Sequence, residues 1–232
     1  MMDTVLLIIL SLASTLAAWL FLAVWKRRAT EETAEAPEKA ATVTTPEWRP
    51  TRKRLAFLIF MFLGLAAISV ALEQIYENNT LTENAKLIVL LAILFIAANT
   101  DARERLIPNK LVLSGIVLRV IFWIVELITI PDNFLDIVKN DLYACLLVVL
   151  FFVVGVLLVK GGIGMGDIKL MLVMCLFQGF YGVVSSLFCS LFVAFVYAII
   201  VLLLRKKTKK DSVAFAPAIL LGTALSVFLT GM

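Results

Sequence analysis

Long apolar blocks separated by short polar segments set the pattern of this 232-residue chain. A helix that spans a membrane needs about 20 mostly apolar residues. The pattern therefore predicts an all-α fold, a polytopic transmembrane helix bundle of about eight membrane helices, or six to eight because two blocks are short. The predicted spans are 4–25, 55–72, 86–100, 111–130, 141–159, 170–183, 184–204 and 212–231.

The sixth of these blocks is the least regular. Gln178, Gly179 and Gly182 interrupt its apolar run. Glycine weakens a helix and permits backbone angles that other residues avoid. We therefore expect this helix to tilt, break or end early.

Composition agrees with a membrane protein and excludes several kinds of catalytic site. Hydrophobic residues make up 62% and charged residues 16% of the chain, against roughly half and a quarter in an ordinary soluble domain. Histidine is absent, which excludes serine–histidine and cysteine–histidine catalysis. Cys145, Cys175 and Cys189 form no Cys-x-x-Cys pair, so no zinc site is expected. We expect no metal and no organic cofactor.

Basic residues concentrate in four of the polar segments. Segments 26–54, 101–110, 160–169 and 205–211 hold 18 of the 21 Lys and Arg residues. Cytoplasmic loops of membrane proteins are enriched in these residues. The bias predicts that the four segments are cytoplasmic and that both termini lie outside. It also accounts for the net charge of +4 without a nucleic-acid partner.

The pattern divides the chain into three parts. Residues 1–25 are predicted to form an N-terminal membrane helix, because this block is long for a signal peptide and its basic cluster follows it. Residues 26–54, rich in Ala, Thr, Glu and Pro, are predicted to be a cytoplasmic linker. Residues 55–232 are predicted to form the membrane-embedded domain.

Two aspartates occupy equivalent positions in this topology. Asp101 and Asp167 each lie at the cytoplasmic edge of a predicted helix, 66 residues apart in sequence but at one membrane depth. Two carboxylates held close together share a proton. The ionised member can take a proton from water while the protonated member donates to a carbonyl oxygen. The pair predicts peptide hydrolysis, with the acid and the base not yet distinguished.

Glycines surround the second aspartate. Four of the six residues from 161 to 166 are Gly, including Gly164 and Gly166. Because glycine allows positive φ and close backbone approach, a substrate strand could lie directly on this segment. The alternative is an ordinary turn between two helices. Nucleotide binding is not expected, because neither glycine motif for phosphate binding is matched.

Three segments together resemble a known family. They are Asp101 with Ile107-Pro108-Asn109, then Gly164-Met165-Gly166-Asp167-Ile168-Lys169-Leu170, then Phe215-Ala216-Pro217. In order, spacing and predicted cytoplasmic placement they resemble the type IV prepilin peptidases, which are GxGD-type membrane aspartic proteases. The resemblance runs over residues 86–229.

The resemblance implies a membrane aspartic endopeptidase of the inner (plasma) membrane, with the lipid bilayer as its surroundings. Its substrates would be prepilin or pseudopilin precursors, which lose a short basic leader at the cytoplasmic face. Asp101 and Asp167 correspond to the catalytic pair. The expected substrate-binding residues are Gly164, Gly166, Lys169, Pro108 and Pro217.

One departure from the family pattern concerns the N-terminal part. Larger members carry a cysteine-rich N-terminal domain there and also methylate the new N-terminus of the substrate. Here the corresponding part is a membrane helix followed by a cysteine-free linker. We therefore expect a short, peptidase-only form without methyltransferase activity.

Three further charged residues need partners. Lys169 either holds the charge of the aspartate pair or a substrate backbone group, or it extends to the membrane interface as a topology charge. Arg119 and Glu126 lie seven residues apart in one predicted helix, on nearly the same face. Because charged groups within membranes seek partners, we expect them to pair with each other or with other helices.

Two other functions fit parts of the pattern. A presenilin-like intramembrane protease also uses a GxGD motif, but its companion aspartate follows a tyrosine, whereas Thr100 precedes Asp101 here. A non-enzymatic small transporter or assembly scaffold would account for the helices and the topology. It would not account for two aspartates at the cytoplasmic edge beside a glycine-rich segment.

Overall fold

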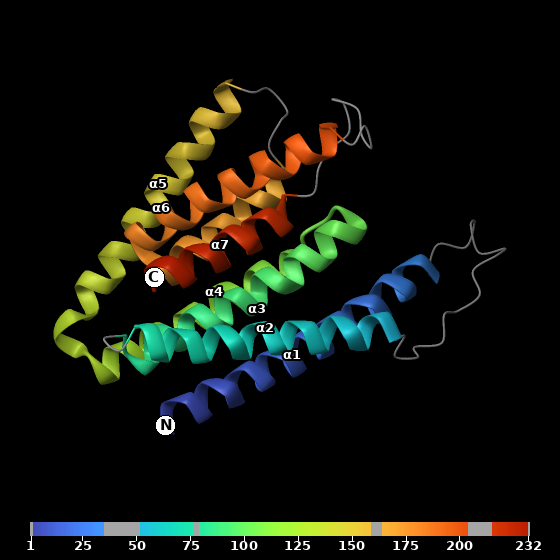
Figure 1. Ribbon diagram of the computed structural model, residues 1–232. Coiled ribbons are helices and arrows are strands. Elements are labelled where there is room, and N and C mark those ends of the chain that lie inside the picture. The colour runs from blue at the N-terminus through green and yellow to red at the C-terminus, as the bar shows by residue number, and fades with distance from the viewer. Residues whose placement is uncertain (1, 35–51, 77–78, 159–163, 204–214, 232) are drawn as a thin grey trace.

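The computed structural model describes residues 2–34, 52–76, 79–158, 164–203 and 215–231. These residues form helices and no strand (Figure 1), which confirms the predicted all-α fold. The helices are α1 (Met2–Ala34), α2 (Arg52–Ile75), α3 (Leu81–Glu104), α4 (Asn109–Thr129), α5 (Phe134–Leu158), α6 (Met165–Leu203) and α7 (Ala216–Thr230), with a 3-10 turn at Pro131–Asn133 before α5.

Six helices in the described part of the chain, α1 to α6, are long and apolar enough to cross a membrane. α7 is also apolar but has only 15 residues. The predicted transmembrane bundle is therefore confirmed. The helix ends differ from the predicted ones, because α1 continues to Ala34 and α2 begins at Arg52, both inside the predicted linker. The middle of that linker lies outside the described residues.

The break expected in the sixth block falls at Gly179. Its φ of 66° and ψ of −168° separate α6 into a first arm, residues 165–178, and a second arm, residues 180–203. Such angles are nearly restricted to glycine. A Cβ here would also collide with the side chain of Asn140 on α5, whose Oδ1 accepts a hydrogen bond from the Phe180 N–H at 3.3 Å. Gly179 is thus required for its backbone angles and for the space it leaves.

The two arms of α6 run in opposite directions, as their contacts with α7 establish. Along the second arm, Ser185 hydrogen-bonds to Ser226 and Ser190 to Ile219. Residue numbers therefore increase along this arm as they decrease along α7, so the two segments are antiparallel. Along the first arm the order is reversed: its beginning lies beside the beginning of α7, and Met174 in mid-arm contacts the Thr223 hydroxyl. α6 therefore supplies two antiparallel segments, which correspond to the predicted spans 170–183 and 184–204.

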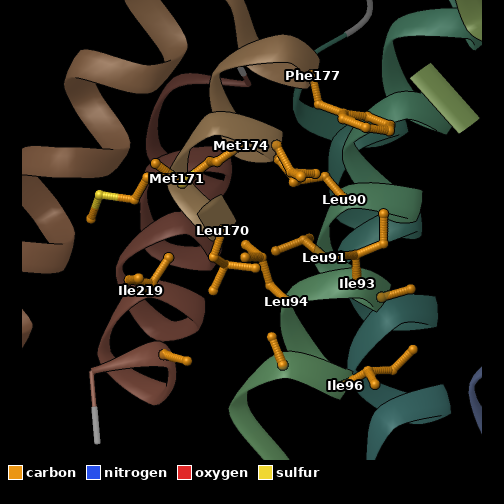
Figure 2. Close-up of a cluster of buried hydrophobic side chains, with 14 of the residues drawn as sticks. Leu90, Leu91, Ile93, Leu94, Ile96, Leu170, Met171, Met174, Phe177 and Ile219 are labelled. Carbon is orange, nitrogen blue, oxygen red and sulfur yellow. The ribbon is translucent and has the colours of Figure 1, made fainter. Parts of the chain in front are cut away.

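α3 is the central helix of the bundle. Within its apolar span 67% of the residues are buried, compared with 22–28% in the other five long helices. Leu90, Leu91 and Leu94 of α3 form one cluster with Leu170, Met171, Met174 and Phe177 of the first arm and with Ile219 of α7 (Figure 2). Dense apolar packing of this kind fixes helices relative to one another. It therefore also fixes the residues at their ends.

A buried ion network joins α3, α4 and α5. The side chain of Arg119, 1% exposed, donates from Nε and Nη2 to Asp141 and lies 3.1 Å from Glu126 Oε2. Lys86 Nζ lies 2.7 Å from Glu126 Oε1, and Trp123 Nε1 donates to Asp141 at 2.9 Å. The expected pairing of Arg119 and Glu126, with each other and with other helices, is confirmed. Two cations and two carboxylates thus neutralise each other where an unpaired charge would be costly.

Gly222 sets the closest approach of α7 to α6, because a Cβ there would meet backbone atoms of Ser190. We expect Gly222→Ala to separate the two helices and to lower the free energy of unfolding by about 1–3 kcal/mol. The measurement is the melting temperature in detergent micelles. Gly64→Ala is the control, because nothing lies within 4 Å of a Cβ at that helical position. Equal melting temperatures for the two variants would contradict the described packing.

Arg119→Leu tests the ion network. It leaves the Asp141 carboxylate buried with Trp123 as its remaining donor, and breaking a buried pair by removing one partner costs about 3–5 kcal/mol. We expect a large loss of folded protein, measured as the monodisperse fraction after detergent extraction. Lys139→Leu is the matched control: its partner Asp136 is exposed, and such surface pairs contribute about 0–1 kcal/mol. Normal yield of Arg119→Leu would show that the network is dispensable for folding.

Candidate active site

Asp101 lies near the end of α3 and is 8% exposed. α3 ends at Glu104, and the following Arg105 takes a left-handed φ of 51° and donates its N–H to the Asp101 carbonyl. The buried residues Ile107 and Pro108 then lead into α4, for which Pro108 is the N-cap with a φ of −64°. Because proline fixes φ near this value, the Ile-Pro-Asn segment reverses the chain within a few residues and keeps the start of α4 close to Asp101.

The start of α7 provides a hydrogen bond to Asp101. The Ala216 N–H donates to Asp101 Oδ2 at 3.0 Å. Ala216 is the first residue of its helix, where N–H groups have no partner inside the helix. Pro217 follows at the second position, where the missing N–H of proline costs little. The Phe-Ala-Pro segment thus presents a helix N-terminus, with its partial positive charge, to the Asp101 carboxylate.

Asp167 lies in the first turn of α6 and is partly buried. Its N–H bonds to the Gly164 carbonyl at 3.1 Å, which begins the helix. A Cβ at residue 164 would lie only 3.0 Å from Asp167 Oδ2. The absence of a side chain at Gly164 therefore leaves space directly beside the carboxylate.

Gly166 brings the two aspartate segments into contact. A Cβ at this position would lie 3.3 Å from Ile107 Cβ, closer than nearly all such contacts. The glycines with positive φ in the described residues are Gly179 and Gly231. Close approach, and not positive φ, therefore explains Gly164 and Gly166. Gly161 and Gly162 lie outside the described residues.

The contact between these segments brings Asp101 and Asp167 close enough to interact electrostatically. They come from the end of α3 and the start of α6, the two elements that share the apolar cluster of Figure 2. Two neighbouring carboxylates can share a proton and act on one water molecule as acid and base. No group of three or more Cys, Asp or Glu side chains that could hold a metal ion occurs in the described ranges.

Lys169 contacts the neighbouring segment. Its Nζ donates to Asn109 Oδ1 at 2.9 Å, which links α6 to the first residue of α4. Sequence reasoning did not identify Asn109 as the partner of Lys169, nor Ile107 as the residue that packs on Gly166. Both residues belong to the Ile-Pro-Asn segment. The sequence therefore identified the segment as part of the site but not the contacts that its residues make.

All seven residues predicted for the site lie at one end of the bundle, where α3 ends and where α4, α6 and α7 begin. Asp101, Asp167, Gly164 and Gly166 lie at or beside the carboxylate pair, and Lys169 is linked to Asn109. Pro108 adjoins Ile107, which lies against Gly166. Pro217 adjoins Ala216, whose N–H donates to Asp101. The opposite end of the bundle, at left in Figure 1, is where α1 begins and α7 ends.

Comparison with known families supports the resemblance found in the sequence. The model of the type IV leader peptidase family matches residues 88–199, which include Asp101, Asp167 and the segments that join them. The match contains most of α3 to α6 and leaves α1, α2 and α7 outside. No curated protein and no solved structure matches the chain. Residues 88–199, which carry both aspartates, are therefore similar to the type IV leader peptidase family.

Proposed function

We propose that this protein is a membrane aspartic endopeptidase that removes the basic leader from type IV prepilin-like precursors. The observation that carries the proposal is that Asp101 and Asp167 lie close enough to interact electrostatically at one end of an apolar helix bundle, within the segment that matches the leader peptidase family. Asp101 and Asp167 belong to two of the four segments in which basic residues concentrate, which supports a cytoplasmic active site in the inner membrane. The substrate would be a prepilin or pseudopilin precursor with a single apolar helix.

The roles of the two aspartates follow from their different surroundings. Asp101 accepts the Ala216 N–H at the start of α7, and such a donor suits a carboxylate. Asp101 is therefore the base that takes a proton from water, while the water oxygen attacks the scissile carbonyl carbon. Asp167 carries the other proton and donates it to the carbonyl oxygen. Collapse of the tetrahedral intermediate breaks the C–N bond. The leaving amine takes up the proton held by Asp101, and the hydroxyl that becomes the new carbonyl returns a proton to Asp167.

The glycines would leave room for the substrate backbone beside the carboxylates. Cleavage requires the scissile amide to lie against both carboxylates, within about 3 Å of each. Gly164 leaves the face of Asp167 uncovered. A substrate backbone could then approach this segment more closely than any side chain would permit.

Substitution of either aspartate tests the proposal. We expect Asp101→Asn and Asp167→Asn each to lower the cleavage rate by at least about 100-fold, because each removes one member of an acid–base pair. The assay co-expresses the protein in membranes with a panel of candidate prepilins and measures the mass of each precursor. Asp136→Asn is the control, because this exposed carboxylate lies at the opposite end of the bundle.

The measured masses of the precursors distinguish the possible results of this assay. Loss of a basic leader, with both substituted proteins present at normal levels but inactive, supports the proposal. An unmodified new N-terminus would agree with cleavage without methylation. Cleavage inside the apolar span of the substrate would favour an intramembrane protease instead. Cleavage that persists in Asp101→Asn or Asp167→Asn would overturn the proposed mechanism.

A further inference from the structure

Two of the three cysteines face each other between α5 and α6. Cys145 lies on α5 and Cys175 on the first arm of α6, and their Sγ atoms are 2.7 Å apart. Carbon atoms that are not bonded pack at about 3.5–4.0 Å, and sulfur is larger than carbon. A thiol is also only a weak hydrogen-bond donor and acceptor. Neither ordinary packing nor a thiol hydrogen bond accounts for so short a separation.

The two cysteines reach the same depth from opposite ends of the bundle. Cys145 follows the first residue of α5 by 11 residues, and Cys175 follows the first residue of α6 by 10. At a helical rise of about 1.5 Å per residue, each lies about 15–16 Å along its helix. The pair is therefore close to the middle of a hydrocarbon layer about 30 Å thick.

One sulfur of the pair is within reach of the lipid. Cys175 is fully buried, whereas Cys145 is partly exposed at the edge of the buried face of α5 that contains Ala144 and Val148. At this depth the surface of the bundle borders lipid and not water. Water-soluble thiols, which keep cytosolic cysteines reduced, do not enter this layer. A lipid-soluble oxidant does.

The distance distinguishes a disulfide from a metal site. Two thiolates on one tetrahedral ion lie about 3.8 Å apart, because each metal–sulfur bond is about 2.3 Å long. The observed separation is much shorter than this. A disulfide has a sulfur–sulfur bond of about 2.05 Å, so a relative shift of about 0.7 Å would close it.

We propose that Cys145 and Cys175 are a site of oxidation that closes to a disulfide within the membrane and ties α5 to the first arm of α6. Two S–H bonds break and one S–S bond forms, so two protons and two electrons leave the pair. A lipid-soluble quinone takes up both and becomes the quinol. The proposal is independent of the peptidase function, because Cys175 follows Asp167 by eight residues, or about 12 Å along α6.

Thiol labelling in membranes tests the proposal. Membranes that contain the full chain are reduced with a lipid-soluble phosphine and then treated with a quinone that has no free ring position for a thiol to add to. After acid quenching and denaturation, free thiols are labelled with N-ethylmaleimide and the mass of the protein is measured. We expect labels on all three cysteines of the reduced chain and on one after oxidation. Trypsin cuts at Lys160 and Lys169, so Cys145 and Cys175 should then appear in two peptides joined by the disulfide.

Cys189 is the internal control, because it is partly exposed like Cys145 but lies on the second arm of α6. Its label should persist after oxidation. Copper–phenanthroline, which transfers electrons to oxygen, is the second oxidant. Three labels after both treatments would overturn the proposal, as would a disulfide that includes Cys189 or joins two chains. Joined peptides with copper–phenanthroline alone would support the disulfide and overturn the quinone as its oxidant.

The melting temperature in detergent micelles tests whether the disulfide ties the two helices together. A disulfide restricts the unfolded chain, and this one joins residues 30 positions apart. We expect oxidised protein to melt about 5 °C or more above reduced protein. Cys145→Ala should abolish the difference and Cys189→Ala should retain it. Equal melting temperatures for oxidised and reduced wild-type protein would overturn the proposed tie. If Cys145→Ala does not fold, the labels and the joined peptides decide.

Discussion

A carboxylate buried in an apolar bundle is stable only where donors face it, because burial removes the water that would otherwise solvate it. Asp101 meets this requirement through the Ala216 N–H at the start of α7. That donor is available only if α7 begins beside the end of α3, which in turn requires the second arm of α6 to return the chain there. The reversal at Gly179, 78 residues along the chain from Asp101, is therefore a condition for the site.

The charged groups of the bundle fall into two arrangements with opposite consequences. Arg119 and Lys86 neutralise Glu126 and Asp141, so each charge has an oppositely charged partner and the network holds three helices together. Asp101 and Asp167 have no Lys or Arg partner within the described residues. Two carboxylates that lack a cation can reduce their repulsion by sharing a proton. The first arrangement is suited to stability, and the second to proton transfer.

The sequence predicted the helices because membrane spans require long apolar runs that few other structures need. It also located the break near Gly179, since glycine interrupts an otherwise apolar helix. The two predicted spans 170–183 and 184–204 already imply a reversal, but the sequence could not place it at Gly179, because that depends on the Gly179 angles and on the fit against Asn140. The apolar span of α1, Asp3–Val24, lies within one residue of the predicted span 4–25, although the helix itself continues to Ala34.

For the site, the motifs identified the segments but not how they touch. The structure adds a close approach between Gly166 and Ile107, a packing relation that no spacing rule contains. The partner of Lys169 was likewise unpredictable, because it depends on which face of α6 meets α4. The sequence identifies the residue types of a motif, whereas the tertiary fold determines which distant segments lie close together.

The segment that matches the leader peptidase family is not the whole of the site. It contains both aspartates, but the donor to Asp101 comes from α7, beyond its end. On the other side, α1 precedes the segment and lies across an apolar groove from α3 and α4. α7 and α1, both outside the match, therefore make different contacts. α7 donates to the Asp101 carboxylate, and α1 lines an apolar groove with α3 and α4.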